Sequence, residues 1–122
     1  MLLAGLLMVA MACKKDVQGV PVDAFAQVNP KIVYKEGICS IQFTLEEYPY
    51  KEVGLRVATS KTLLHLNQGL TVEIANQVSA NRYAVFFNTL LANKTYHYQI
   101  YVKDSASAKE VYSDVYSFTT NP

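Results

Sequence analysis

Apolar and polar residues alternate with a period of two along most of this chain. In the segment 40–45 (SIQFTL), the apolar residues Ile41, Phe43 and Leu45 alternate with polar ones. The same alternation recurs in five further segments: 53–59, 71–75, 83–87, 95–104 and 115–120. A period of two is typical of a strand with one buried face. Short strands of this kind, separated by turns, predict an antiparallel β-sandwich.

Residues that favour turns separate these segments. Gly, Asn, Pro and small polar residues gather in five connections: 35–37, 46–52, 67–69, 79–81 and 104–109. Apolar residues with a sustained 3.6-residue period are missing, and only 63–68 (LLHLNQ) is compatible with a short helical turn. The pattern therefore predicts a single all-β domain without internal repeats.

The N-terminal residues follow a different pattern. An apolar run from Leu2 to Met11 leads into Ala12 and Cys13, and the charged residues KKD follow at once. Ten apolar residues suit the core of a signal peptide and are too few to cross a bilayer, which needs about 20. A cysteine behind a small residue at the end of such a run resembles the lipobox of bacterial lipoproteins.

The lipobox resemblance implies cleavage before Cys13 and a diacylglycerol on its thiol. The chain then divides into a signal peptide (1–12), a lipid-anchored tether (13–22) and one domain (23–122), held at the bacterial outer membrane on its periplasmic or external side. The membrane is the partner that this resemblance implies. The alternative is an apolar N-terminal strand or helix of a cytosolic protein, in which Cys13 is an ordinary thiol.

Charge excludes several partners. The chain has 11 basic and 10 acidic residues, and these are scattered along the sequence. Nucleic-acid binding and electrostatic attachment to anionic lipid both need clustered positive charge, so neither is predicted. Cleavage before Cys13 would leave 110 residues (122 minus 12), enough for one hydrophobic core.

The segment 89–106 (TLLANKTYHYQIYVKDSA) carries a second resemblance. A leucine six residues before a tyrosine that opens a tyrosine-rich strand, here Leu90 and Tyr96, resembles fibronectin type III domains. Ala92 and Lys94 stand where that family usually has Pro and Thr. The resemblance implies a seven-stranded, immunoglobulin-like antiparallel β-sandwich. It also implies that Tyr96 is a tyrosine corner, buried with its hydroxyl bonded to nearby backbone.

The two cysteines have different expected roles. Cys39 shares its strand face with Ile41 and Phe43, which predicts a buried, unpaired thiol that behaves as a small apolar residue. A disulfide between Cys13 and Cys39 is the competing interpretation.

Catalytic patterns are sparse. His65 and His97 are the only histidines, and HxxH, HExxH, CxxC and glycine-rich phosphate-loop patterns are all missing. The adjacent Glu46 and Glu47 are expected to form a solvated loop edge. We therefore predict no enzyme activity, no metal and no cofactor.

Two groups of residues are candidates for binding. Tyr48 and Tyr50 flank Pro49 in a loop that should share one end of the sandwich with the loop 104–109, although one tyrosine could instead cover the edge of the core. Arg56 and Tyr101 should point outward on one sheet, either as a cation–π pair on a solvated face or as a docking surface.

Phe86 should point outward from the opposite sheet, where a neighbouring side chain or the tether is expected to cover it. Together these observations favour a lipid-anchored envelope protein with a non-catalytic binding or spacer module for a protein or glycan. The alternative is a structural subunit of a surface assembly that pairs through a sheet edge.

Overall fold

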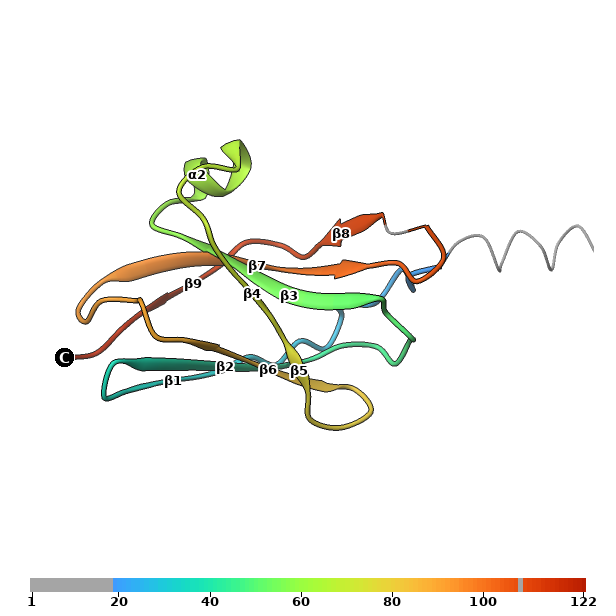
Figure 1. The fold of residues 1–122 in the computed structure, drawn as a ribbon, viewed down its shortest axis with the longest axis horizontal. Coiled ribbons are helices and arrows are strands. Elements are labelled where there is room, and N and C mark those ends of the chain that lie inside the picture. Colours follow the sequence, from blue (N-terminus) through green and yellow to red (C-terminus); the bar gives the residue numbers. More distant parts are fainter. Residues whose placement is uncertain (1–18, 108) are drawn as a thin grey trace, which may run out of the picture.

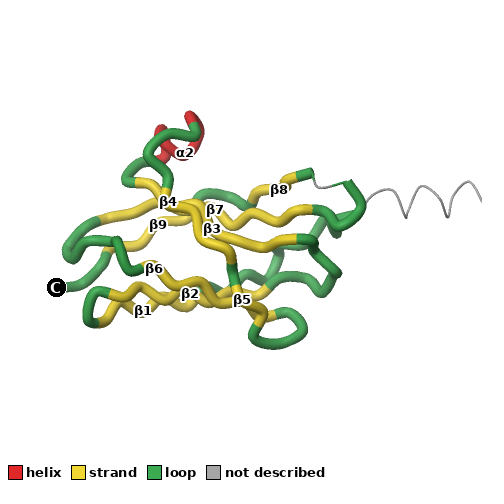
Figure 2. The backbone as a smooth tube through the Cα atoms, in the orientation of Figure 1, coloured by secondary structure: helices red, strands yellow, loops and turns green. Residues whose placement is uncertain are grey.

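The computed structural model describes residues 19–107 and 109–122. The predicted signal peptide, Cys13 and most of the tether lie outside the described residues. Figure 1 and Figure 2 show two layers of strands with a short helix on the outside of one layer. The elements are β1 (Lys31–Lys35), β2 (Ile38–Thr44), β3 (Glu52–Ala58), α2 (Lys61–Leu66), β4 (Thr71–Ile74), β5 (Asn76–Gln77), β6 (Arg82–Phe87), β7 (Thr95–Lys103), β8 (Glu110–Tyr112) and β9 (Tyr116–Thr119).

The strands form two sheets, and every pairing is antiparallel. The first, called here the β2 sheet, has the order β1-β2-β6-β5. The second, called the β7 sheet, has the order β4-β3-β7-β8, and β9 also pairs with β7. The predicted all-β antiparallel sandwich is confirmed.

The described residues form nine strands rather than the predicted seven, and a β-bulge is one reason. Tyr101 pairs with Tyr112 in β8, whereas Tyr98 pairs with Tyr116 in β9. Three steps along β7 therefore correspond to four steps along the segment that pairs with it. The one extra residue is a β-bulge, and it divides this segment into β8 and β9. Ser113 lies in the break, and its hydroxyl accepts a hydrogen bond from the Ile100 N–H at 2.9 Å.

The second reason is that the chain changes sheets after β4. β4 pairs with β3 in the β7 sheet, and the two-residue β5 pairs with β6 in the β2 sheet. Only Ala75 separates the two short strands, and its N–H donates to the Val53 carbonyl at 2.8 Å. One run of extended chain thus contributes two strands.

The core lies between the sheets and consists of the inward-facing positions that alternation predicts on β2, β3, β6 and β7. Its largest fully buried side chains include Tyr98, Phe43, Phe87, Ile41, Leu55 and Ile100. Cys39 is also fully buried and has no disulfide partner among the described residues. Burial raises the pKa of its thiol to about 11, so the thiol stays protonated at neutral pH.

Tyr96 is buried where β7 begins, and its hydroxyl accepts a hydrogen bond from the Leu91 N–H at 2.8 Å. Its ring packs against Phe118 in β9, with 5.8 Å between centroids. This is the contact between a buried tyrosine and nearby backbone that the sequence predicts. It ties the loop before β7 to the strand itself.

The period-two pattern is wrong for β4, where it predicts an inward face for Val72 and Ile74. Val72 is 49% exposed and Ile74 is also exposed. Val72 pairs with Arg56, and paired residues point to the same side of a sheet, so both lie on the outer face. The polar Thr71 and Glu73 occupy the alternate positions on this edge strand.

The helix α2 covers part of the same outer face. It begins two residues earlier than the predicted segment 63–68 because the Ser60 hydroxyl caps it, accepting from the Leu63 N–H at 3.2 Å. Asn67 ends it in a left-handed conformation with φ of 56°. Leu64 is the buried residue that anchors the helix.

The Tyr96 contact yields a stability prediction. Tyr96→Phe leaves the Leu91 N–H without its partner, and we expect it to lower the free energy of unfolding by about 1–3 kcal/mol with the fold retained. Urea denaturation followed by far-UV circular dichroism measures this. Tyr116→Phe, at a half-buried tyrosine that packs against Tyr98, is the matched control and should cost less. A Tyr96→Phe protein as stable as the wild type would contradict the prediction.

Candidate binding surfaces

The loop that joins β2 to β3 brings its two tyrosines together at one end of the sandwich. The Tyr48 and Tyr50 rings are 5.1 Å apart between centroids and tilted by 59°. Both side chains are half-buried, and the Tyr50 hydroxyl donates to the Glu46 carbonyl at 2.6 Å. Burial, followed by the nearby Tyr83 hydroxyl and Glu46 carboxylate, raises the pKa of Tyr50 well above its ordinary value. The Tyr50 hydroxyl therefore stays protonated at neutral pH, and its hydrogen bond fixes the ring beside Tyr48.

Asp104 connects this loop to the one that follows β7, so the predicted sharing of one end by the two loops is present. The Tyr48 hydroxyl donates to Asp104 Oδ1 at 3.0 Å. The Ala106 N–H and the Ser107 hydroxyl also donate to the carboxylate, each at 3.1 Å. The Ala106 bond first, and then the two hydroxyls, lower the pKa of Asp104 although the carboxylate is largely covered.

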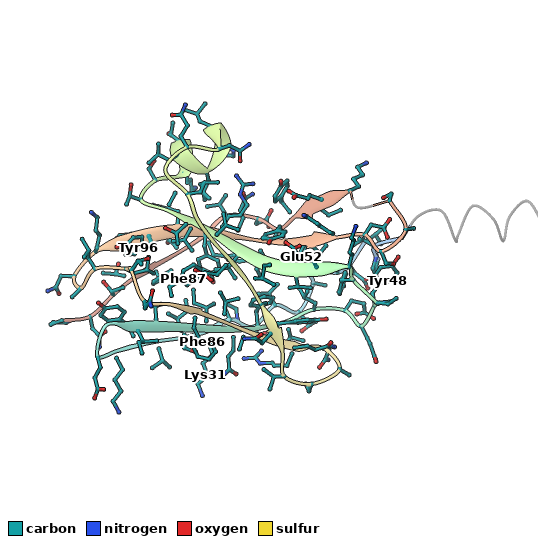
Figure 3. All side chains as sticks on the ribbon, viewed as in Figure 1. Lys31, Tyr48, Glu52, Phe86, Phe87 and Tyr96 are labelled. Carbon is teal, nitrogen blue, oxygen red and sulfur yellow. The ribbon has the colours of Figure 1, made fainter. Side chains whose placement is uncertain are left out.

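The N-terminal end of the described chain reaches the same place. A Cβ atom on Gly19 would lie 2.2 Å from Asp104 Oδ2, so only a glycine allows this close approach. Val20 and Phe25 pack against the core nearby, and Ala24 is buried. The last residues of the predicted tether thus belong to the folded domain. Figure 3 shows Tyr48 at this end and Tyr96 at the opposite end.

A groove runs beside the tyrosine loop. It lies between that loop and the β4–β5 segment, has a volume of about 430 Å³, and is called here the tyrosine groove. Its lining combines the rings of Tyr48, Tyr50 and Tyr83 with the polar side chains of Glu52 and Gln77. Aromatic rings beside a few polar groups are the usual composition of a small-ligand or peptide site.

The structure corrects the interpretation of Arg56. Its guanidinium lies over the Tyr112 ring, 4.7 Å from the centroid, so the cation–π partner is Tyr112 rather than Tyr101. Its Nη2 donates to the Leu64 carbonyl at 2.9 Å and to the Asn67 side chain. Arg56 is only 8% exposed because it holds α2 against the sheet.

The side chain of Tyr101 is likewise buried by contacts with other residues of the domain. It is 4% exposed, and its ring lies over Gly54, where an added Cβ would come within 2.5 Å of the ring. Its hydroxyl donates to Glu52 Oε2 at 2.5 Å. Burial and that hydrogen bond raise the pKa of Tyr101 above its ordinary value. Both residues point outward as predicted. Their own neighbours cover them almost completely, so they present little surface area to a partner.

Phe86 points outward from the β2 sheet, as predicted, and is 54% exposed. The expected cover by a neighbouring side chain is therefore not present among the described residues. Ile38 lies beside it and is also exposed. Figure 3 shows Phe86 on the same side of the molecule as Lys31. This apolar patch is separate from both groups of predicted binding residues.

Within residues 19–107 and 109–122, no group of three His, Cys, Asp or Glu side chains is placed to hold a metal ion. In the same ranges, no helix is long and apolar enough to span a membrane.

Comparison with known proteins places the fold. No family model and no curated protein matches the chain. Among solved structures, a purple acid phosphatase from yellow lupin (Lupinus luteus) seeds matches with a TM-score of 0.61 and 13% identity over 76% of this chain. The match spans only 19% of the phosphatase. The carbohydrate-binding module BhCBM56 matches with a TM-score of 0.54 and 7% identity, over 83% of this chain and 98% of the module. At these identities the likeness shows a shared β-sandwich fold.

Three residues of the outer face were not predicted from the sequence: Tyr112, Lys103 and Glu110. Lys103 Nζ lies 3.7 Å from Glu52 and 3.8 Å from Glu110, which joins three strands across the outer face. Tyr112 stands in VYSDVYSF (111–118), where the bulge interrupts the alternation. The alternation therefore gave no signal for which side of the sheet Tyr112 would face.

The hydrogen bonds at Asp104 predict a pH dependence. Because the folded state lowers the pKa of Asp104 from 3.8, its ionised form stabilises the fold at neutral pH. That contribution begins to fall as the pH drops past the ordinary value and is gone below the folded value. Asp104→Asn should therefore be less stable than the wild type at about pH 6 and should lose less stability on acidification to about pH 3.

Urea denaturation at the two pH values measures this difference. The matched control is Asp114→Asn, which replaces an exposed aspartate in the break between β8 and β9. It should follow the wild type at both pH values. Equal acid sensitivity of Asp104→Asn and the wild type would show that the carboxylate does not stabilise this end of the sandwich.

Proposed function

We propose that this chain is a lipid-anchored bacterial envelope protein whose single fibronectin type III-like domain binds a glycan or protein without catalysis. The observation that carries the proposal is the tyrosine groove, in which two fixed aromatic rings border a hollow of about 430 Å³. The likeness of the fold to a carbohydrate-binding module favours a glycan as the partner.

The construction of the groove supports a binding role. Pro49 restricts the loop, and the hydroxyls of Tyr48 and Tyr50 are already bonded to Asp104 and Glu46. Little conformational entropy is therefore lost when a partner contacts the rings. Tyrosine contributes a large contact area at low entropic cost, and loops on a rigid sandwich are common positions for recognition.

The proposed anchor bears on where the groove would lie. Five residues, 14–18, separate Cys13 from Gly19, whose backbone lies close to the Asp104 carboxylate. The six steps from Cys13 to Gly19 reach at most about 20 Å. Tyr48 also contacts Asp104. A lipid on Cys13 would hold the tyrosine groove close to the membrane surface, so its partner would lie in or near the same membrane.

The fibronectin type III assignment rests on three features. The Leu90–Tyr96 spacing matches the family, and the buried Tyr96 bonds to the Leu91 backbone. The sheet order, in which β3 and β7 form the centre of one sheet and β2 and β6 the centre of the other, suits an immunoglobulin-like sandwich. This fold hosts many unrelated functions, so the binding role is argued from the groove.

The alternative function, a subunit of a surface assembly, is favoured by β1. This five-residue strand forms one edge of the β2 sheet, and the exposed Val33 lies at its centre between Lys31 and Lys35. Lysines on an edge strand oppose unregulated pairing, so an added strand would need complementary acidic residues. Neighbouring genes for glycan uptake or hydrolysis would favour binding, and a run of genes for assembly subunits would favour this alternative.

The anchor is tested at Cys13. A Cys13→Ser protein should move from the membrane to the soluble fraction and should not incorporate an alkyne-tagged fatty acid, because the thiol is the attachment point. Several acyl chains give stable anchoring, whereas one chain binds only marginally. Cys39→Ala is the matched control and should remain labelled and membrane-bound. Wild-type protein that stays soluble and takes up no label would disprove the anchor.

The tyrosine groove is tested by the double substitution Tyr48→Ala with Tyr50→Ala. Loss of two aromatic anchors should weaken partner binding by at least about tenfold, since such residues dominate binding energy. Arrays of glycans and purified envelope proteins, read with wild type and variant in parallel, measure this. Phe86→Ala is the control for removal of an exposed aromatic ring elsewhere. A partner that binds wild type and double variant equally would place the site elsewhere.

A further inference from the structure

The outer face of the β7 sheet carries a second groove, of about 380 Å³. Its floor comes from β3 and β7, one wall from β4 and the segment that joins α2 to it, and the other wall from β8. Figure 1 shows α2 and β8 rising on the same side of the β3–β7 pair. We call it the outer-face groove.

One wall presents an aromatic ring whose position is fixed. Tyr112 is 41% exposed, and the guanidinium of Arg56 lies over its ring. The hydrogen bonds of Arg56 to Leu64 and Asn67 fix the guanidinium. The facing wall contributes Leu70 and the exposed Val72, which are apolar. A flat ring opposite apolar side chains suits a ligand with C–H-rich faces.

The polar lining is balanced in charge. Lys103 lies between the carboxylates of Glu52 and Glu110, and Arg56 supplies the second cation. Two cations and two carboxylates give the groove no net formal charge, so neither an anionic nor a cationic ligand is favoured. The carboxylates accept hydrogen bonds and the ammonium donates them, which is what a molecule rich in hydroxyl groups requires.

We propose that the outer-face groove binds a neutral saccharide, with a sugar ring against Tyr112 and its hydroxyls bonded to Glu110, Lys103 and Glu52. The site shares only Glu52 with the lining of the tyrosine groove and has its own aromatic residue. The proposal therefore goes beyond the proposed function and does not depend on what the tyrosine groove binds.

The test is calorimetric titration of the full chain, purified in a detergent without a sugar headgroup. The probes are maltohexaose, cellohexaose and mannohexaose, with hexagalacturonate as an acidic counterpart. We expect at least one neutral probe to bind with a Kd below about 1 mM. Tyr112→Ala should weaken that binding by at least about tenfold, and Tyr112→Phe, which keeps the ring, should retain most of it.

Two controls separate this proposal from the function proposed above. Phe86→Ala removes an exposed ring on the other sheet and should bind the probe as the wild type does, whereas Tyr48→Ala alters the tyrosine groove and reports whether the probe is bound there instead. Thermal unfolding checks that each variant is folded. Failure of all three neutral probes, binding of the acidic probe alone, or equal loss in Tyr112→Ala and Tyr112→Phe would overturn the proposal. Binding that is lost in Tyr48→Ala and kept in Tyr112→Ala would overturn it too and would support the tyrosine groove.

Discussion

The antiparallel pairing of β3 with β7 fixes the positions of most residues that matter on this molecule. Its register runs from Glu52 opposite Lys103 to Ala58 opposite His97. Inward residues of both strands fill the core, and outward residues carry the Arg56 and Tyr101 contacts. Gly54 stands opposite Tyr101, and because it has no side chain the tyrosine ring can lie flat against the sheet. A shift of this register by one residue would exchange the core face for the solvent face.

The same two strands set the ends of the sandwich. β7 ends at Lys103, so Asp104 follows at the point where the tyrosine loop enters β3. The Lys51 N–H donates to the Lys103 carbonyl at 2.9 Å, which holds the two loops together through the backbone. The Asp104 carboxylate then needs only short local contacts to reach Tyr48. The arrangement of the tyrosine groove is thus a consequence of the central pairing together with one buried carboxylate.

Alternation predicts the core of β2, β3, β6 and β7 because these strands have a neighbour on each side and one face in the interior. It fails on β4, an edge strand whose apolar Val72 and Ile74 lie on the outer face. The strand count fails at two bends: Ala75 carries no turn signal, and the pair Ser113–Asp114 is much shorter than connections such as 104–109. The Tyr96 contact was predictable because the motif that specifies it spans only seven residues, Leu90 to Tyr96. The partner of Arg56 was not predictable, since the bulge decides which tyrosine of the last segment lies beside it.

The outer face of the β7 sheet shows how one residue can serve two purposes. A sheet that packs on the core with one face normally leaves its other face to solvent. Arg56 and Tyr101 lie on the outer face of the β7 sheet, yet both are almost fully covered. Arg56 bonds to the end of α2 and stacks on Tyr112, so the same guanidinium holds the helix and fixes the ring. A cation–π contact of this kind contributes about 0.5–1 kcal/mol when exposed and about 2 kcal/mol when desolvated. Fixing Tyr112 in the free protein lowers the entropy that a ligand must remove on binding. The helix inserted between β3 and β4 therefore helps both to cover the sheet and to build the wall of a groove.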